Sequence, residues 1–171
     1  MRRVFGITGW KNSGKTTLTE KLVTELVARG WTVSTVKHAH HDFDIDKSGT
    51  DSFRHRQAGA TEVAIASGRR WALMHELRGE DEPTLDDILA RLAPADIVLV
   101  EGYKREAHKK IEARRLEAKD RTPLSTGDPN IVAVAADFAV EREKLPVFNL
   151  DDTKSIADLI EQITGLVAQT K

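Results

Sequence analysis

The chain has 171 residues, a formal net charge of -1 and no cysteine, so its composition excludes a disulfide framework, a thiolate metal site and a strong overall attraction to nucleic acid or membranes. This length fits one compact domain with a buried core, and we expect a single domain over residues 1–171. No stretch has the apolar run of a signal peptide or a membrane span, which favours the cytoplasm.

Short apolar segments alternate along the chain with amphipathic segments of helical spacing. Strands are expected near residues 3–8, 31–38, 61–67, 69–77, 95–102, 131–136 and 146–150, and helices near residues 15–29, 51–59 and 84–92 and from about residue 153. Thr84 and Asp87 have the spacing of a capping box. The alternation predicts an α/β fold in three layers, with a mainly parallel β-sheet flanked by helices.

The glycine-rich stretch GWKNSGKTT joins the first expected strand to the first expected helix. Its spacing matches the P-loop pattern G-x-x-x-x-G-K-[ST] in the required strand–helix context, so the predicted fold is P-loop NTPase-like. Lys15 would contact the β- and γ-phosphates, and Thr16 would bind Mg²⁺. An ordinary glycine-rich turn with a surface lysine is the alternative. The predicted nucleotide-binding residues here are Gly9, Lys11, Asn12, Ser13, Gly14, Lys15, Thr16 and Thr17.

The segment DIVLVEG is the clearest buried strand in the chain. Its apolar residues run from Ile97 to Val100, so Glu101 would lie at the carboxyl edge of the sheet, where ligands of open α/β sheets bind. We expect Glu101 to bind Mg²⁺ or to position water, and Glu101 and Lys15 are the candidate catalytic residues. A solvated carboxylate at a strand end is the alternative.

The loop after the second expected strand is rich in histidine and aspartate: it contains His38, His40, His41, Asp42, Asp44 and Asp46. Three interpretations remain open for it. They are a transition-metal site, a switch-like loop whose Asp42 or Asp46 reaches the Mg²⁺ shell, and a solvated loop. On the short helix that follows, Arg54 could face phosphates or solvent.

Three segments together resemble one protein family. They are GWKNSGKTTL, VKHAHHDFDIDKSGTDSFRHRQAGA and VLVEGYK, and their order is that of the MobB family, the molybdopterin-guanine dinucleotide biosynthesis adapter proteins. The resemblance runs from residue 3 to about residue 115 and is weaker beyond it. It implies a homodimeric protein that binds GTP and Mg²⁺, has weak GTPase activity and partners the guanylyltransferase that joins GMP to molybdopterin.

Guanine recognition has no obvious motif in this chain, because the N-K-x-D string of common GTPases does not occur. The candidates are Asp137, after the strand at 131–136, and Asn149 or Asp151, after the last strand. A helix N-cap explains Asp151 equally well, so Asp137 is preferred. The expected preference for GTP therefore follows from the family resemblance.

The segment from Tyr103 to Asn130 is strongly charged, with strand-like pieces at most around residues 111–115. Its basic residues could receive a pterin phosphate of molybdopterin or the acidic face of a partner, and a solvated loop is the alternative. Tyr103 is its only aromatic platform and no nucleic-acid-binding module is present, so we expect no nucleic-acid partner. The candidate pterin or partner contacts are His38, Arg54, Gly102 and Lys104.

Two functional classes fit these residues, and a third fits them less well. The first is a GTP-binding adapter in which GTP and Mg²⁺ order the loop at 38–50 for a partner enzyme, and hydrolysis is slow because no water-orienting glutamine or in-line arginine stands out. The second is a nucleoside or small-metabolite kinase with Asp42 as its base. The third is a nickel-inserting GTPase, although the CxxC motif or long histidine tract of that class is missing.

Overall fold

The computed structural model of the protein describes residues 2–39, 43–141 and 143–167. The chain forms two compact units, a larger one made of residues up to His38 and from Ile88 onward, and a smaller one from Ala39 to Asp87. Each unit contains its own β-sheet. No helix in the described part of the chain is long and apolar enough to cross a bilayer.

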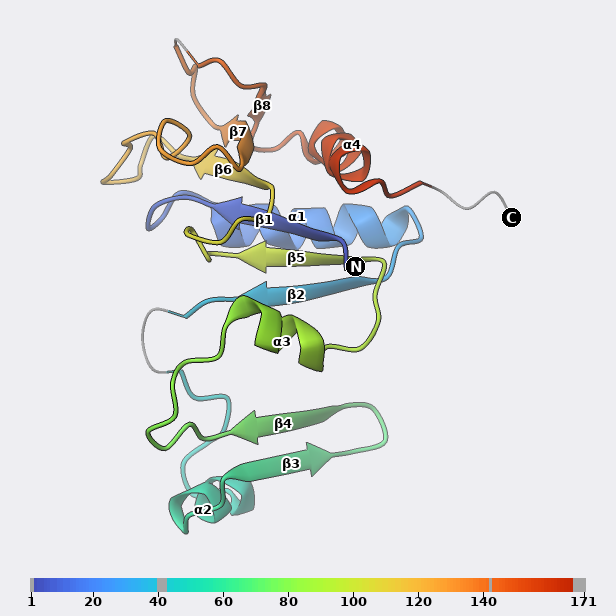
Figure 1. Cartoon of the computed structure of the whole chain (residues 1–171), viewed down its shortest axis with the longest axis vertical. Helices are drawn as coiled ribbons and strands as arrows, with labels where there is room; N and C mark the ends of the chain where they lie inside the picture. Colours follow the sequence, from blue (N-terminus) through green and yellow to red (C-terminus); the bar gives the residue numbers. More distant parts are fainter. Residues whose placement is uncertain (1, 40–42, 142, 168–171) are drawn as a thin grey trace. The chain divides into compact units, whose positions relative to one another are not determined.

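The larger unit is built on a six-stranded sheet in which every neighbouring pair of strands is parallel (Figure 1). The strand order is β2-β5-β1-β6-β7-β8. The strands are β1 (Val4–Thr8), β2 (Val33–Lys37), β5 (Ile97–Glu101), β6 (Lys110–Arg114), β7 (Ile131–Ala136) and β8 (Val147–Asn149). The expected α/β fold with a mainly parallel sheet is confirmed. Because β1 lies between β5 and β6, the segments that follow these three strands meet at one edge of the sheet.

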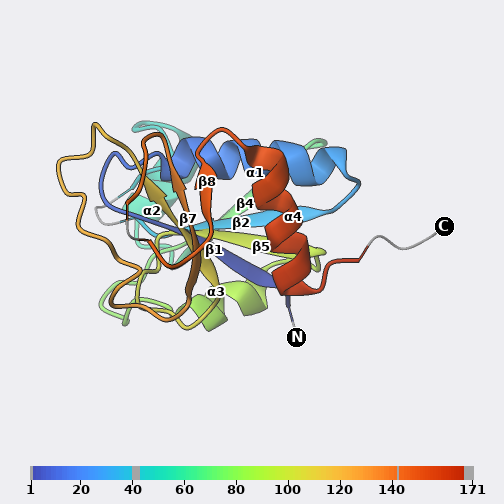
Figure 2. The same ribbon diagram turned by 90° about the horizontal axis from the view of Figure 1, so that it is seen from above.

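Two helices, α1 (Lys15–Ala28) and α4 (Thr153–Thr164), share one hydrophobic core with this sheet (Figure 2). Aliphatic residues of both helices meet apolar residues of the central strands there, namely Leu18, Leu22, Leu26, Ile156 and Ile160 with Phe5, Ile7, Leu99 and Ile111. Each fully buried side chain of this size stabilises the fold by about 1.5–3 kcal/mol. This core holds the end of β1 and the start of α1 in fixed positions.

Strand β6 lies where strand-like pieces were expected, around residues 111–115, but its surroundings differ from the expectation for the charged segment. It is a full strand in the middle of the sheet, and its charged residues are buried rather than solvated. The Lys110 ammonium lies 3.0 Å from the Asp128 carboxylate, and Arg114 lies 2.7 Å from Glu112. Buried charges are tolerated where each has an opposite charge and hydrogen bonds. The partner carboxylates explain why this charged sequence forms a central strand.

The smaller unit contains α2 (Asp51–Gln57) and an antiparallel hairpin of β3 (Glu62–Ala66) and β4 (Trp71–His75). The guanidinium of Arg56 ties its segments together, with Asp44 and Glu76 each at 2.8 Å and Asp46 at 3.4 Å. One ion-pair cluster therefore joins the loop before α2, the helix itself and the end of β4.

Helix α3 (Leu85–Arg91) begins with the expected capping box. The Asp87 carboxylate accepts the Thr84 N–H at 3.0 Å, and the Thr84 hydroxyl oxygen accepts the Asp87 N–H at 3.2 Å. Two backbone donors at the start of the helix are thereby satisfied, as the sequence pattern predicts.

Candidate functional site

The loop between β1 and α1 has a backbone that its glycines make possible. Gly9 has a φ of 147° and Gly14 a φ of 90°, and Asn12 is also left-handed at 63°. A Cβ at Gly9 would lie 2.5 Å from the Ala113 carbonyl oxygen, so a larger residue would displace the loop from β6. The sequence pattern thus produces a tight turn against the sheet, directly before a helix N-terminus that favours anions.

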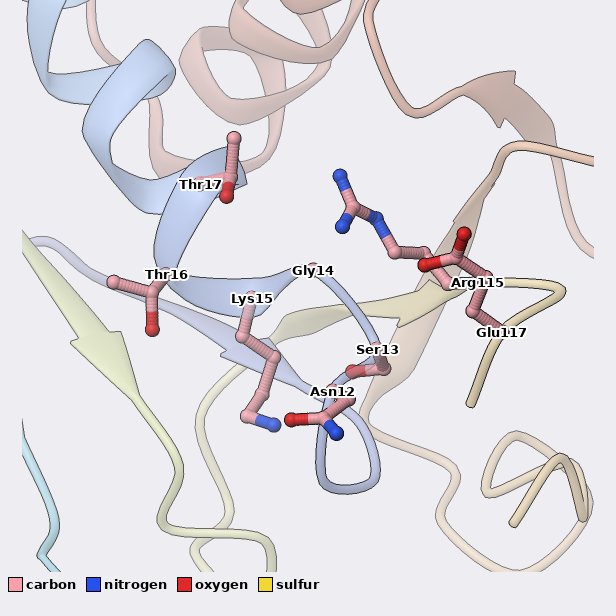
Figure 3. Close-up of a pocket in the computed structure, with 8 residues that line it drawn as sticks. All are labelled: Asn12, Ser13, Gly14, Lys15, Thr16, Thr17, Arg115 and Glu117. Atoms are coloured by element: carbon pink, nitrogen blue, oxygen red, sulfur yellow. The ribbon is translucent and has the colours of Figure 1, made fainter. Parts of the chain in front are cut away.

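This loop lines a cavity of about 390 Å³ (Figure 3). Ligand pockets of about 300–1,000 Å³ are typical for small molecules and cofactors. The lining residues are Asn12, Ser13, Gly14, Lys15, Thr16, Thr17, Arg115 and Glu117. The structure therefore brings the predicted residues 12–17 together around one cavity. The other two predicted loop residues, Gly9 and Lys11, are not among those that line it.

Lys15 is half-buried at this cavity, and its ammonium donates to the carbonyl oxygen of Trp10 at 2.6 Å. Burial lowers the pKa of Lys15 below its ordinary value, the Glu101 carboxylate opposes that shift, and the positive charges of Lys104 and Lys37 add to it. A bound anion would favour the charged form of Lys15 by the same physics. The electrostatics of the loop therefore suit a phosphate.

Thr16 and Glu101, each predicted to bind Mg²⁺, lie in contact in the structure. The Thr16 hydroxyl donates to the Glu101 carboxylate at 2.8 Å, and that side chain is buried at the end of β5. The Lys37 ammonium lies 3.3 Å from the same carboxylate oxygen, because the register of β2 and β5 places Lys37 opposite Glu101. Hydroxyl and carboxylate oxygens are the kind of metal ligand that Mg²⁺ prefers. Sequence reasoning missed Lys37, since nothing in the sequence gives the pairing of β2 with β5.

Three of the four predicted pterin or partner contacts also gather near the loop. Gly102 has a φ of 93°, and a Cβ there would lie 3.2 Å from the Cβ of His38. The rings of His38 and Tyr103 are 4.9 Å apart between centroids, and the Lys104 ammonium lies 3.9 Å from the centroid of the Trp10 ring. The segment after β5 therefore rests against both the end of β2 and the P-loop.

The remaining predicted residues of the histidine–aspartate region belong to the smaller unit. Burial raises the pKa of Asp46, but hydrogen bonds from the Ser52 and Thr50 hydroxyls and from Arg56 outweigh it, so this pKa lies below its ordinary value. These bonds give Asp46 a structural role in its own unit, and its role as a metal ligand stays a prediction. The side chain of Arg54 is 75% exposed.

Asp42, the other predicted metal ligand of this region, lies outside the described residues, as do His40 and His41. Within the described ranges, no group of three or more histidine, aspartate or glutamate side chains is arranged to hold a metal ion. The transition-metal interpretation of the loop therefore stays untested.

Asp137, the preferred candidate for reading guanine, lies at the end of β7 beside the loop that follows β6. One of its carboxylate oxygens accepts the Leu116 N–H at 2.8 Å. The alternatives have local partners too: the Asn149 side-chain oxygen accepts the N–H of Asp151 at 2.8 Å, and Asp151 forms an ion pair with Lys21 at 2.7 Å. Each has a structural explanation, and a role of Asp137 in base recognition stays a prediction.

Two cavity residues, Arg115 and Glu117, were missed by sequence reasoning. They follow β6 directly, and the charged segment around them was expected to contain little regular structure. The signal that could have found them is the alternation of charged and apolar residues at 110–114, which is compatible with a strand ending at the same edge as the P-loop.

Comparisons with known proteins agree on one family. A family model described as Molybdopterin guanine dinucleotide synthesis protein B matches residues 4–137. A molybdopterin-guanine dinucleotide biosynthesis adapter protein of Haemophilus influenzae is 41% identical over 92% of this chain and 87% of its own length. The protein of the same name from Escherichia coli K12 is 37% identical over 92% of this chain and 90% of its own. The crystal structure of a MobB homologue from Bacillus stearothermophilus has a TM-score of 0.72 and 34% identity, covering 96% and 99% of the two chains.

Proposed function

The chain belongs to the MobB family, and from this premise we propose that it is a GTP-binding adapter protein of molybdopterin-guanine dinucleotide biosynthesis. The proposal includes a cytoplasmic location, a homodimer, and the molybdenum-cofactor guanylyltransferase as the partner enzyme. Its main structural support is the P-loop cavity, where Lys15 lies close to the bonded pair of Thr16 and Glu101.

In the proposed complex, phosphate oxygens of GTP occupy the cavity above residues 12–17 and accept hydrogen bonds from the N-terminal backbone of α1. The Lys15 ammonium exchanges its bond with the Trp10 carbonyl oxygen for bonds with the β- and γ-phosphates. A charge-assisted bond to phosphate is about twice as strong as one between neutral groups, so this exchange favours binding. The same anion offsets the mutual repulsion of the neighbouring lysines.

Mg²⁺ would neutralise part of the triphosphate charge, and Thr16 and Glu101 are the residues that would hold it. Their oxygens fit this role because they already converge, at 2.8 Å from one another. Lys37 supplies the positive charge next to Glu101, so a cation and Lys37 would compete for one carboxylate. Asp46 is a weaker candidate ligand, since hydroxyl groups of its own unit already occupy its carboxylate.

Trp10 connects the proposed nucleotide site with a candidate partner surface, because it contacts both Lys15 and Lys104. Its carbonyl oxygen accepts from Lys15, its indole N–H donates to the Thr122 carbonyl oxygen at 2.8 Å, and its ring contacts Lys104. When Lys15 turns to phosphate, the loop loses one of the bonds that fix Trp10. We place the contact with the guanylyltransferase, and with an anionic group of molybdopterin, on the segment at 102–104 for this reason.

The hairpin of the smaller unit supports the homodimer in the proposal. Cross-strand neighbours share a face of a sheet, and one face of this hairpin carries Ala66 opposite Trp71 and Ala64 opposite Leu73. Trp71 is 73% exposed and Leu73 is 50% exposed. Apolar groups gathered on a two-stranded sheet are typical of a surface that pairs with another protein.

Calorimetric titration with Mg²⁺–GTP and Mg²⁺–ATP tests the nucleotide proposal. We expect binding of GTP in preference to ATP, hydrolysis on the order of 10⁻⁴ s⁻¹ without a partner, and loss of binding in Lys15→Ala with an unchanged far-UV circular dichroism spectrum. Equal affinity for ATP, or normal binding by Lys15→Ala, would contradict the proposal. Fast turnover with an added small-molecule hydroxyl would instead support the kinase alternative.

The partner is tested by mixing the purified protein with the purified molybdenum-cofactor guanylyltransferase in the presence of GTP. We expect one complex in size-exclusion chromatography, and weaker association for Lys104→Ala than for the wild type. Lys154→Ala is the control, because Lys154 lies in the first turn of α4, where its carbonyl oxygen accepts from Arg29 after the end of α1. Failure of the wild-type chain to bind the enzyme would remove the adapter role.

A further inference from the structure

In the described part of the chain, two basic side chains line the cavity, and the proposed function gives a role to Lys15 but none to Arg115. It follows β6 directly and lines the cavity opposite Lys15 (Figure 3). Its Nε is buried without a hydrogen-bond partner among the described residues. A Cβ at Gly14 would lie 3.0 Å from this Nε, so the guanidinium packs directly against the phosphate-binding loop. A buried donor of this kind gains most from a ligand that satisfies it.

The strand order gives the cavity two distinct ends. Glu101 is the last residue of β5 on one side of β1, and Arg115 follows β6 on the other side. Thr16 is bonded to Glu101, so the metal-binding end lies toward β5. In Figure 3 the Lys15 chain runs toward Asn12, whereas the Arg115 guanidinium points toward the first turn of α1. The two basic groups therefore serve different parts of an extended anion.

We infer that Arg115 binds the α-phosphate of the nucleotide and so fixes the direction in which it lies, with its γ-phosphate toward β5 and its nucleoside toward β6 and β7. This inference rests on the proposed nucleotide binding. Arginine suits the position because its planar guanidinium is always charged and can bond two oxygens of one phosphate.

Glu117 supports the same direction. It lines the cavity on the Arg115 side. A carboxylate repels the phosphate chain but accepts hydrogen bonds from ribose hydroxyls and from the N–H groups of a base. Its presence places the nucleoside, rather than the γ-phosphate, at this end of the cavity.

The backbone next to Arg115 is also held in place before any ligand binds. On its N-terminal side, the Glu112 carboxylate accepts the N–H groups of Leu124 and Ser125, each at 3.0 Å, and so closes the loop after β6. On its C-terminal side, Asp137 accepts the N–H of Leu116. A backbone fixed on both sides needs less ordering when a ligand binds, which favours affinity. Asp137 therefore contributes to the site by positioning the Arg115 loop.

The test compares GDP and GTP affinities, measured by calorimetry, for the wild type, Arg115→Ala and Arg115→Lys. Because both nucleotides carry the α-phosphate, Arg115→Ala is expected to weaken both by the same factor, about tenfold to a hundredfold. Arg115→Lys should recover part of this loss, since it restores the charge but not the paired bonds. The control is Lys119→Ala, which removes a positive charge from the same loop without lining the cavity.

The possible outcomes separate this inference from the proposed function. A wild-type chain that binds neither nucleotide overturns both. A wild-type chain that binds GTP, with Arg115→Ala binding equally well and keeping its circular dichroism spectrum, overturns the role of Arg115 alone. A loss restricted to GTP would place Arg115 at the γ-phosphate and reverse the direction of the nucleotide.

Discussion

The two units of this chain differ in which side chains they bury: the larger unit buries charged residues in its sheet, and the smaller one exposes apolar residues. In the larger unit, Lys110, Glu112 and Arg114 lie buried in a central strand, each paired with an opposite charge. In the smaller unit, Trp71 and Leu73 are exposed on a two-stranded hairpin. Buried ion pairs do little for net stability but fix groups in one arrangement, whereas exposed apolar groups are available to a partner. From this contrast we expect the larger unit to bind the small anion and the smaller one to meet a protein surface.

The strongest test of this contrast is Glu112→Ala. Glu112 is 1% exposed and accepts two backbone N–H groups as well as the Arg114 guanidinium. Its removal leaves buried donors unpaired, and we expect the free energy of unfolding to fall by about 3 kcal/mol, as measured by urea denaturation.

The matched control for Glu112→Ala lies in the smaller unit. Glu76→Ala removes one of the carboxylates around Arg56, but Asp44 and Asp46 remain. The Glu76 side chain is 34% exposed, so we expect the free energy of unfolding to fall by about 1 kcal/mol or less. Similar losses in both variants would remove the distinction between a buried and a solvated charge network.

This contrast also explains what the sequence predicts and what it does not. The loop between β1 and α1 could be predicted with its strand–helix context, because a short sequence pattern identifies it. That pattern consists of Gly9, Gly14, Lys15 and Thr16. The burial of the charges in β6 could not be predicted, because some of their partners lie more than ten residues away, at Asp128 for Lys110 and in the Ser125 loop for Glu112 and Arg114.

The same limit applies to the cavity. Arg115 reaches it through the pairing of β6 with β1, and Lys37 reaches the neighbouring Glu101 through the pairing of β2 with β5. Strand order is a property of the folded sheet, and no short window of sequence contains it. Local motifs therefore identified one wall of the site, and tertiary structure supplied the other.

The hairpin surface is tested next by Trp71→Ser. If the homodimer in the proposed function uses this face, loss of the indole should raise the dimer dissociation constant about thirtyfold, since a buried tryptophan at an interface contributes about 2 kcal/mol or more. Analytical ultracentrifugation measures the change. Val147→Ser is the control, because it removes another exposed apolar side chain, at 45% exposure, from the larger unit.

An equal effect of the two substitutions would mean that exposed apolar groups in general, rather than this hairpin, control association. An unchanged dimer in Trp71→Ser would place the interface elsewhere. GTP affinity should stay at the wild-type value in both variants, because neither side chain lines the cavity.

The units should also differ in their response to acid through one histidine in each. In the larger unit, burial lowers the pKa of His108 to about 4, with the Lys110 charge adding to the shift and Asp128 opposing it. The unfolded chain, with a pKa of 6.5, takes up the proton more readily, so this contribution to stability is present above pH 6.5 and is lost as the pH falls toward 4. Urea midpoints should fall over this range, and less steeply in His108→Leu. Parallel pH profiles for the two proteins would contradict this.

The smallest effect is expected at His75 in the hairpin, with the opposite sign. Hydrogen bonds with the Glu62 and Glu80 carboxylates, at 2.9 and 3.2 Å, raise its pKa above 6.5. The folded state therefore holds the proton more tightly, and this contribution is complete below pH 6.5 and is lost as the pH rises through the raised pKa. Amide protection factors of β3 and β4 should accordingly be higher at pH 6 than at pH 8, and this difference should shrink in His75→Gln. Because the residue is near the surface, solvent screens the interaction and the change in protection should be modest. Protection that rises with pH in the wild type would show that the two carboxylates do not stabilise the charged ring, and the contrast between the histidines would then disappear.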